Sequence, residues 1–264
     1  MSTESELNIF LENQVGIIEI NRPPNNHFDH QLISQIADSF EDFDKDNNCR
    51  CIVLCSEGKH FCAGANFGKD RDMQDKTDPY SELYTQAVRL FRNQKPVIAA
   101  VQGGAIGGGL GLSLVADFRI GCSESRFSAN FSRLGFHQGF GTTVTLPRVV
   151  GNQNAAMMML TGRRLKGEEA LTIGLIDYLV PQIEVRTKAI ELAEEISESG
   201  PLAVQSIRAT IRSGLADEVE KVVSWELSEQ MRLQSTEDFK EGIKASLERR
   251  KPNFKGSWYE ISFF

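Results

Sequence analysis

Short apolar runs separated by polar turns dominate the first sixty positions of the chain. Two β-rich runs, residues 7–12 and 15–20, are followed by Pro23-Pro24, which ends a strand because proline cannot donate to a ladder. Over residues 29–44 apolar side chains recur every three or four positions, which predicts an amphipathic helix. The apolar run at 51–55 then predicts a buried strand.

Beyond residue 60 the pattern predicts further strands and helices and a helical C-terminal quarter. The charged stretch 69–79 favours a loop, and the glycine-rich stretch 103–111 favours a loop that leads into a helix over 112–116. The predicted strands are 97–101, 118–120, 126–129 and 175–180, and the other predicted helices are 80–93, 152–160, 167–173 and most of 183–251.

This order of elements predicts an α/β fold. Strands alternate with helices up to about residue 180, which is typical of βαβ units around a largely parallel sheet. A change of composition at Ser199-Gly200-Pro201 divides the chain into a core, residues 1–199, and a helical C-terminal region, residues 200–264.

The composition argues against several classes of protein. The 264 residues are 41% hydrophobic, and 29 Lys and Arg against 36 Asp and Glu give a net charge of −7. No basic run is longer than 249–251, which argues against nucleic acid or an anionic membrane as partner but leaves a local basic pocket for a phosphorylated ligand open. Because no signal-peptide pattern and no apolar stretch of roughly 20 residues is present, we expect a cytoplasmic protein.

The five cysteines raise a zinc hypothesis that their spacing does not support. Cys49, Cys51, Cys55 and Cys62 lie near His60, but two of them fall within a predicted strand, and no paired Cys-x-x-Cys motif is present. Their odd number indicates reduced thiols, and we expect no bound metal.

The glycine-rich stretch follows a predicted strand and precedes a predicted helix. Backbone N–H groups converge on anions in this context. It is not a P-loop, because no Gly-Lys-Ser/Thr ends it, and it is not a dinucleotide fingerprint, because Leu112 stands at the third glycine position. Close packing of a helix on a sheet, with no ligand, is the alternative interpretation.

A second segment of small residues, 61–66 (FCAGAN), also follows a strand and a turn. Two loops that each present a free N–H can form an oxyanion hole, which polarises a carbonyl or thioester oxygen. In a closed site one such donor contributes about 3–4 kcal/mol.

Short motifs spread over nearly the whole chain carry a family resemblance. They are NRP at 21–23 with Asn26, FCAGA at 61–65, KPVIAAVQG at 95–103, GGG at 107–109, ADFRI at 116–120, LPRVVG at 146–151, TGR at 161–163, EG at 241–242 and KPNF at 251–254. Each is weak alone. In this order and spacing they resemble the crotonase (enoyl-CoA hydratase/isomerase) superfamily.

The resemblance implies a ββα spiral core with a helical C-terminal trimerisation region, assembled as a homotrimer or homohexamer. It implies an acyl-CoA substrate, with coenzyme A entering as part of that substrate and no permanently bound cofactor. By resemblance, the N–H groups of Ala65 and Gly108 form the oxyanion hole, and Ala63 contacts the adenine. Arg22 and Arg249 would contact coenzyme A, with a surface salt bridge and a solvated helix charge as their respective alternatives.

Three positions depart from the family pattern. Hydratases of the family carry one glutamate three residues after the oxyanion glycine, here Gly111, and another after the strand that ends near residue 129, here Phe131. Gly139 stands where some family hydrolases and dehalogenases carry an aspartate. Without these carboxylates water addition has no obvious general base, so we do not expect ordinary hydratase activity.

Two other side chains are candidates for the chemistry. His137 is a candidate general acid or base, a role in which histidine is common, and the alternative is a histidine that hydrogen-bonds loop backbone. Tyr84 lies on the helix that borders the pocket in relatives, where it would orient the acyl group or donate a proton, and core packing is the alternative. Phe131, Phe136 and Phe140 predict an apolar acyl pocket.

The sequence thus predicts an enoyl-CoA hydratase/isomerase-like enzyme that stabilises an enolate-like intermediate and lacks both hydratase glutamates. The reaction would be hydrolysis, the making or breaking of a C–C bond, or a proton shift. Two alternatives stay open. One is a non-catalytic acyl-CoA-binding subunit, and the other is a carbonyl or β-diketone hydrolase on the same fold.

Overall fold

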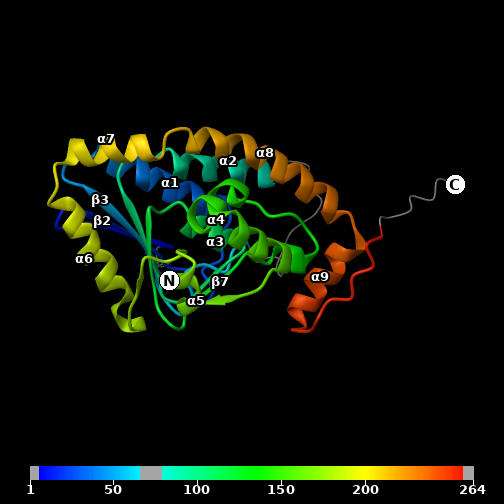
Figure 1. Cartoon of the computed structure of the whole chain (residues 1–264). Coiled ribbons are helices and arrows are strands. Elements are labelled where there is room, and N and C mark those ends of the chain that lie inside the picture. Colours follow the sequence, from blue (N-terminus) through cyan, green and yellow to red (C-terminus); the bar gives the residue numbers. More distant parts are fainter. Residues whose placement is uncertain (1–5, 66–78, 258–264) are drawn as a thin grey trace, which may run out of the picture.

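The chain folds into two β-sheets surrounded by helices (Figure 1). The computed structural model describes residues 6–65 and 79–257, so the predicted loop at 69–79 lies outside the described residues except for Pro79. The larger sheet contains, from edge to edge, β1 (Leu7–Glu12), β2 (Val15–Ile20), β3 (Cys51–Ser56), β4 (Val97–Val101), β6 (Phe118–Gly121) and β9 (Tyr178–Leu179). The smaller sheet contains β5 (Gly104–Ile106), β7 (Arg126–Ser128) and β8 (Leu165–Lys166).

Helices lie on both faces of the larger sheet and around the smaller one. The helices of the described chain are α1 (His30–Lys45), α2 (Pro79–Phe91), α3 (Gly108–Ser113), α4 (Thr142–Thr161), α5 (Gly167–Thr172), α6 (Val185–Ser197), α7 (Pro201–Ile211), α8 (Leu215–Gln234) and α9 (Glu237–Leu247), with 3-10 turns η1 (Asn130–Leu134) and η2 (Gln182–Glu184). In Figure 1, α7 and α8 run above α1 and α2, α6 lies on the opposite side of the sheet, and α9 stands at the far end. No helix in the described part of the chain is both long and apolar enough to cross a bilayer.

The larger sheet is parallel except at one edge, as its sequence pattern predicts. β1 pairs with β2 in antiparallel fashion, and the pairs from β2 to β9 are parallel. In β3, Ile52 and Leu54 join the main core, while Cys51, Val53 and Cys55 face α6 in a second core cluster. Because both faces are buried, this strand is a continuous apolar run rather than an alternating one.

Two predicted boundaries are wrong. The glycine-rich stretch 103–111 is not one loop: it contains β5, and α3 begins in it at Gly108 rather than at 112. The helix predicted at 152–160 matches the part of α4 after a kink at the non-helical Gly151 (φ 77°), and a further helical segment from Thr142 precedes the kink. The strand predicted at 175–180 shortens to two residues, since it pairs with β6 only at Tyr178 and Leu179. Each error falls where glycine or an edge pairing overrides local propensity.

Asp117 ties the C-terminal helices to the sheet. Its Oδ2 accepts hydrogen bonds from the Val97 N–H at 2.8 Å and from Arg208 Nε at 2.8 Å, and its Oδ1 accepts from Arg212 Nη1 at 2.9 Å. The three charged side chains are at most 16% exposed. Since α7 begins at Pro201, the helical region after residue 200 is anchored to the core of its own chain by a largely buried ion-pair network.

Replacing Asp117 tests this anchor. We expect Asp117→Ala to lower the free energy of unfolding by about 3 kcal/mol or more, because two buried guanidinium groups lose their anion. Chemical denaturation measures the loss. Asp42→Ala is the control, because Asp42 pairs with Lys45 where both side chains are more than 70% exposed, and such pairs contribute little. Equal effects of the two substitutions would contradict the assignment.

Candidate active site

Residues 61–65 run alongside β5 and fix the centre of the site. Cys62 and Ala105 form a parallel β-bridge. The Cys62 N–H donates to the Gly104 carbonyl at 2.9 Å, and the Ile106 N–H donates to the Cys62 carbonyl at 3.0 Å. Because these bonds lock the two segments in register, the residues that follow each of them are held next to one another.

Two backbone N–H groups face a cavity at this junction. Ala65 and Gly108 both line the cavity, and neither N–H donates a hydrogen bond to any acceptor in the described part of the chain. Gly108 opens α3, so its N–H has no partner within the helix. A Cβ atom placed on Gly64 would lie 3.3 Å from the Gly108 nitrogen, which shows how closely the segments approach. Two such donors can together hold a carbonyl oxygen that gains negative charge.

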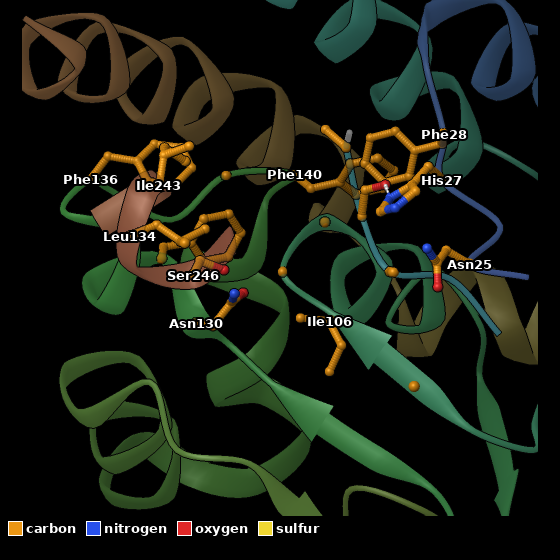
Figure 2. Close-up of a pocket in the computed structure, with 18 of the residues that line it drawn as sticks. Asn25, His27, Phe28, Ile106, Asn130, Leu134, Phe136, Phe140, Ile243 and Ser246 are labelled. Carbon is orange, nitrogen blue, oxygen red and sulfur yellow. Dashed lines mark hydrogen bonds between the residues drawn. The ribbon is translucent and has the colours of Figure 1, made fainter. Parts of the chain in front are cut away.

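The cavity beside these donors has a volume of about 400 Å³, which suits a small ligand or part of a larger one. Figure 2 shows Phe28 and Phe140 on one side of it and Leu134, Phe136 and Ile243 on the other. Phe28 and Phe140 pack with ring centroids 5.4 Å apart. This part of the wall is therefore apolar, as the predicted acyl pocket requires.

Aromatic packing fills the positions at which the family pattern places glutamates. A Cβ atom on Gly111 would lie 2.7 Å from Cβ of Phe140. A side chain larger than that of glycine therefore does not fit at this position unless Phe140 moves. Phe131 lines the cavity and packs edge-on against Phe136, with ring centroids 5.5 Å apart. Of the described residues that line the cavity, none carries a carboxylate.

Tyr84 and Gln230 form a hydrogen-bonded pair in the cavity wall. Tyr84 is 6% exposed, and its hydroxyl donates to Gln230 Oε1 at 2.7 Å. Gln230 Nε2 in turn donates to the His137 carbonyl at 3.0 Å, which fixes the amide. A Cβ atom on Gly139 would lie 1.9 Å from the Tyr84 oxygen, so this pair requires glycine at position 139. Tyr84 thus both packs in the core and presents a polar atom to the cavity wall.

The structure places the other predicted site residues as follows. Ala63 lines the cavity. Arg22 lies outside the cavity lining and forms ion pairs with Glu6 and with Asp29, the latter at 2.8 Å, which is the salt-bridge alternative for this residue. His137 and Arg249 also lie outside the lining. His137 Nδ1 is 2.9 Å from the Gln138 carbonyl oxygen, and Arg249 follows the end of α9.

Cysteine chemistry and metal binding find no support near the site. The five cysteines are buried free thiols, and burial raises the pKa of Cys62 to about 12, so this thiol stays protonated beside the junction. Within residues 6–65 and 79–257, no three His, Cys, Asp or Glu side chains gather as metal ligands would.

Local sequence patterns do not identify several polar residues that line the cavity. Gln230 is separated from Tyr84 by 146 positions, and no local pattern connects the two. Asn130, Ser246, Arg126 and Arg164 also line the cavity. They come from η1, α9, the start of β7 and the residue before β8, and only the tertiary fold brings these elements together.

Comparison with known proteins shows a likeness over nearly the full length of the chain. The model of the enoyl-CoA hydratase/isomerase family matches residues 11–257. The crotonyl-CoA hydratase of Syntrophomonas wolfei is 32% identical over 253 residues, which cover 94% of this chain and 97% of the relative. The 1,2-epoxyphenylacetyl-CoA isomerase of Escherichia coli is 31% identical over 255 residues, which cover 93% of this chain and 97% of the relative.

Solved structures show the same likeness in three dimensions. A crystal structure of an enoyl-CoA hydratase/isomerase from Pseudoalteromonas atlantica T6c matches with a TM-score of 0.85 at 28% identity, covering 95% of this chain and 100% of that one. A carnitinyl-CoA hydratase from Mycobacterium avium matches with a TM-score of 0.83 at 28% identity, covering 97% and 100%. The arrangement of sheets and helices is therefore shared with proteins of this family.

A fully buried carboxyl group on α8 holds the loop that carries Phe140. Glu226 accepts hydrogen bonds from the Gly141 N–H at 2.8 Å and from the N–H and hydroxyl of Thr143 at 3.0 and 2.6 Å. These contacts satisfy donors at the start of α4 that have no helical partner. Desolvation dominates over the hydrogen bonds and raises the pKa of Glu226 from 4.5 to about 7.

The raised pKa predicts a pH-dependent stability. Between pH 4.5 and 7 the folded protein binds a proton at Glu226 that the unfolded chain lacks. The stabilisation is therefore complete below pH 4.5 and is lost as the pH rises through 7. Relative to Glu226→Gln, we expect the wild-type free energy of unfolding to fall by on the order of 3 kcal/mol over this range, at about 1.4 kcal/mol per pKa unit.

Urea denaturation at a series of pH values measures this difference. Glu220→Gln, an exposed site on the same helix, serves as the control and should leave the wild-type slope unchanged. If Glu226→Gln and the wild type had parallel pH profiles, the group would not titrate in this range in the folded protein.

Proposed function

The chain belongs to the enoyl-CoA hydratase/isomerase family and has the crotonase fold, and we propose that it acts on an acyl-CoA thioester through an oxyanion hole formed by the Ala65 and Gly108 N–H groups. The observation that carries this proposal is the pair of N–H groups that face the cavity without a protein acceptor. Negative charge that develops on the thioester oxygen would be stabilised there, and the intermediate would be enolate-like.

The reaction that follows is not ordinary hydration of an enoyl group. General-base activation of water needs a carboxylate or an equivalent group near the substrate, and the described cavity wall has aromatic packing at both expected positions. Hydrolysis, making or breaking a C–C bond, or a proton shift is compatible with such a wall. In each case the protein polarises the thioester carbonyl.

Tyr84 is our candidate for the side chain that orients the acyl group or donates a proton. Its position in the cavity wall supports this role, and Gln230 is the positioning residue that holds its hydroxyl. Coenzyme A would enter as part of the substrate, with the backbone of Ala63 against the adenine and Arg249 as a further contact. No permanently bound cofactor is proposed.

We also propose that the chain assembles as a homotrimer or homohexamer through the region 200–264. Large apolar side chains on its helices support this proposal, because Leu202 is 80% exposed, Ile211 74% and Trp225 63%. Apolar exposure of this extent on neighbouring helices is typical of surfaces that bind a partner.

A second candidate function is a non-catalytic acyl-CoA-binding subunit. The observation that favours it is the loss of a carboxylate at both positions while the two N–H donors and the cavity are retained. Such a protein would hold the thioester without converting it. A carbonyl or β-diketone hydrolase would use the same N–H donors on a substrate without coenzyme A.

A substrate panel separates these functions. We expect turnover of at least one saturated, unsaturated or β-keto acyl-CoA by mass spectrometry. Hydration of crotonyl-CoA should be at least roughly a hundred-fold slower than by the crotonyl-CoA hydratase of Syntrophomonas wolfei, because the general base is absent. Hydration at the relative's rate would contradict the role given to the missing glutamates. Binding without turnover would favour the binding subunit, and turnover of free β-diketones alone would favour the hydrolase.

Substitutions at the hydrogen-bonded pair test Tyr84. We expect Tyr84→Phe to lower kcat by roughly a hundred-fold with little change in KM, since the loss of an acid or orienting group acts on the reaction step. Gln230→Leu should lower kcat in the same direction by a smaller factor. Tyr178→Phe, at a tyrosine 41% exposed on β9, is the control.

The variant His137→Ala, measured in the same experiment, separates the two interpretations of this histidine: a general acid or base, or a side chain that hydrogen-bonds loop backbone. A general acid or base role would cost roughly a hundred-fold in kcat. The contact of its ring with loop backbone and its place outside the lining instead lead us to expect a change of no more than a few-fold.

For the first of these variants, Tyr84→Phe, an unchanged kcat would show that Tyr84 takes no part in the reaction.

A further inference from the structure

Two arginines line the cavity, and neither contacts a carboxylate in the described part of the chain. Arg126 and Arg164 form no salt bridge within residues 6–65 and 79–257, although a hydrogen bond from Ser123, together with the charge of Arg126, lowers the pKa of the exposed Glu168. Arg22, in contrast, pairs with Glu6 and Asp29. In a chain of net charge −7, arginines that line a cavity without a contacting counter-ion mark a place where an anion is favoured.

The smaller sheet positions both arginines. Arg126 opens β7, and its Nη1 donates to the carbonyls of Ser123 and Ser125 at 2.7 Å each, which fixes the guanidinium plane. β8 pairs antiparallel with β7, and Arg164 immediately precedes it. Arg126 is therefore already oriented by backbone carbonyls, while Arg164 has no hydrogen-bond partner in the described part of the chain.

Positive charge at this end of the cavity acts on the side chain of His60. It lines the cavity, and its Nδ1 accepts a hydrogen bond from the Gly104 N–H at 3.1 Å, next to Arg126 in the sheet. Burial lowers the pKa of the His60 imidazole, and positive charge on three neighbours lowers it further: Lys59, Arg164 and His27. The electrostatic potential near His60 is therefore positive, although the net charge of the chain is −7. It comes from the basic residues at this end of the cavity.

The length of β5 determines which part of a ligand these arginines can reach. Gly104, the sheet partner of Arg126, is four residues before Gly108, so their Cα atoms lie at most roughly 13 Å apart at about 3.3 Å per residue of strand, because β5 itself ends at Ile106. A carboxylate attached near the thioester carbonyl would lie only a few ångströms from the Gly108 N–H. The pantetheine arm has about the backbone length of four extended amino-acid residues, roughly 14 Å, so the phosphates at its far end match this separation.

We propose that Arg126 and Arg164, with His60 between them and the oxyanion-hole segment, bind the phosphate groups of coenzyme A. This inference rests on the proposed function. It assigns the binding of the coenzyme A phosphates to Arg126 and Arg164 rather than to Arg22. The guanidinium groups supply charge-assisted hydrogen bonds to phosphate oxygens, for which arginine geometry is well suited. The acyl group then lies at the apolar end of the cavity.

Binding measurements with and without the phosphates test this site. We expect Arg164→Gln to weaken binding of acetyl-CoA in calorimetry by about ten-fold, and Arg126→Gln/Arg164→Gln by about a hundred-fold. Binding of S-acetyl-pantetheine, which has no phosphate, should be unchanged by either substitution. Raising the salt concentration should weaken acetyl-CoA binding to the wild type more than to the double variant.

Arg163→Gln is the matched control, because Arg163 is adjacent in sequence, exposed and outside the cavity lining. Arg164→Gln alone removes no described hydrogen bond, so it keeps the test valid if the double variant does not fold. In the wild type, NMR titration should show the pKa of His60 rising when acetyl-CoA binds. Wild-type affinity in both Arg164→Gln and the double variant, or an equal loss with S-acetyl-pantetheine, would overturn the inference. A wild-type protein that binds no acyl-CoA would instead overturn the proposed function, and this inference with it.

Discussion

The backbone pairing of residues 61–65 with β5 is the constraint on which the site depends. The bonds between Cys62 and the Gly104–Ile106 strand set the register, so Ala65 and Gly108 line one cavity. Main-chain donors have no side chain that substitution can remove. The proposed oxyanion hole therefore does not depend on the two positions, here Gly111 and Phe131, at which the family pattern places carboxylates. What differs from the family pattern is the step that would follow polarisation.

The helix α8 completes this site from the far end of the sequence. Gln230 bonds to Tyr84 and to the His137 carbonyl, and Glu226, one turn earlier, bonds to Gly141 and Thr143. Both side chains hold the segment that carries Gly139 and Phe140, which shapes the wall where carboxylates would otherwise stand. The C-terminal region, held to the sheet through Asp117, thus contributes to the cavity of its own chain and also exposes large apolar side chains.

Local sequence patterns predicted those features that depend on neighbours in the chain. The strands 7–12 and 15–20 match the observed ones: β2 is buried at every position, whereas β1, at the edge of the sheet, is buried only at Leu7 and takes its register from its pairing with β2. The motifs at 61–65 and 107–109 pointed to Ala65 and Gly108 because the small residues needed for close approach are contiguous. Gln230, Arg126 and Arg164 were missed because their partners and their shared cavity come from distant segments. The choice between the two interpretations of Arg22 needs the tertiary structure for the same reason: its ion pairs are with Glu6 and Asp29, which no motif includes.

The distribution of polarity along the cavity favours one orientation of a ligand. Aromatic and aliphatic side chains surround one end, and Arg126 and Arg164 stand at the other, beyond β5. A ligand with an uncharged acyl group and a phosphorylated tail would bind with the acyl group at the apolar end and the phosphates near the arginines. In the opposite orientation, phosphates among aromatic rings would lose several kcal/mol of hydration free energy without a counter-ion. The junction at Gly108 lies where β5 meets the apolar end, so this orientation alone would bring the thioester carbonyl to the two N–H donors. Recognition of this kind needs no general base. The loss of both carboxylates therefore restricts which reaction can follow without weakening the basis for binding the thioester.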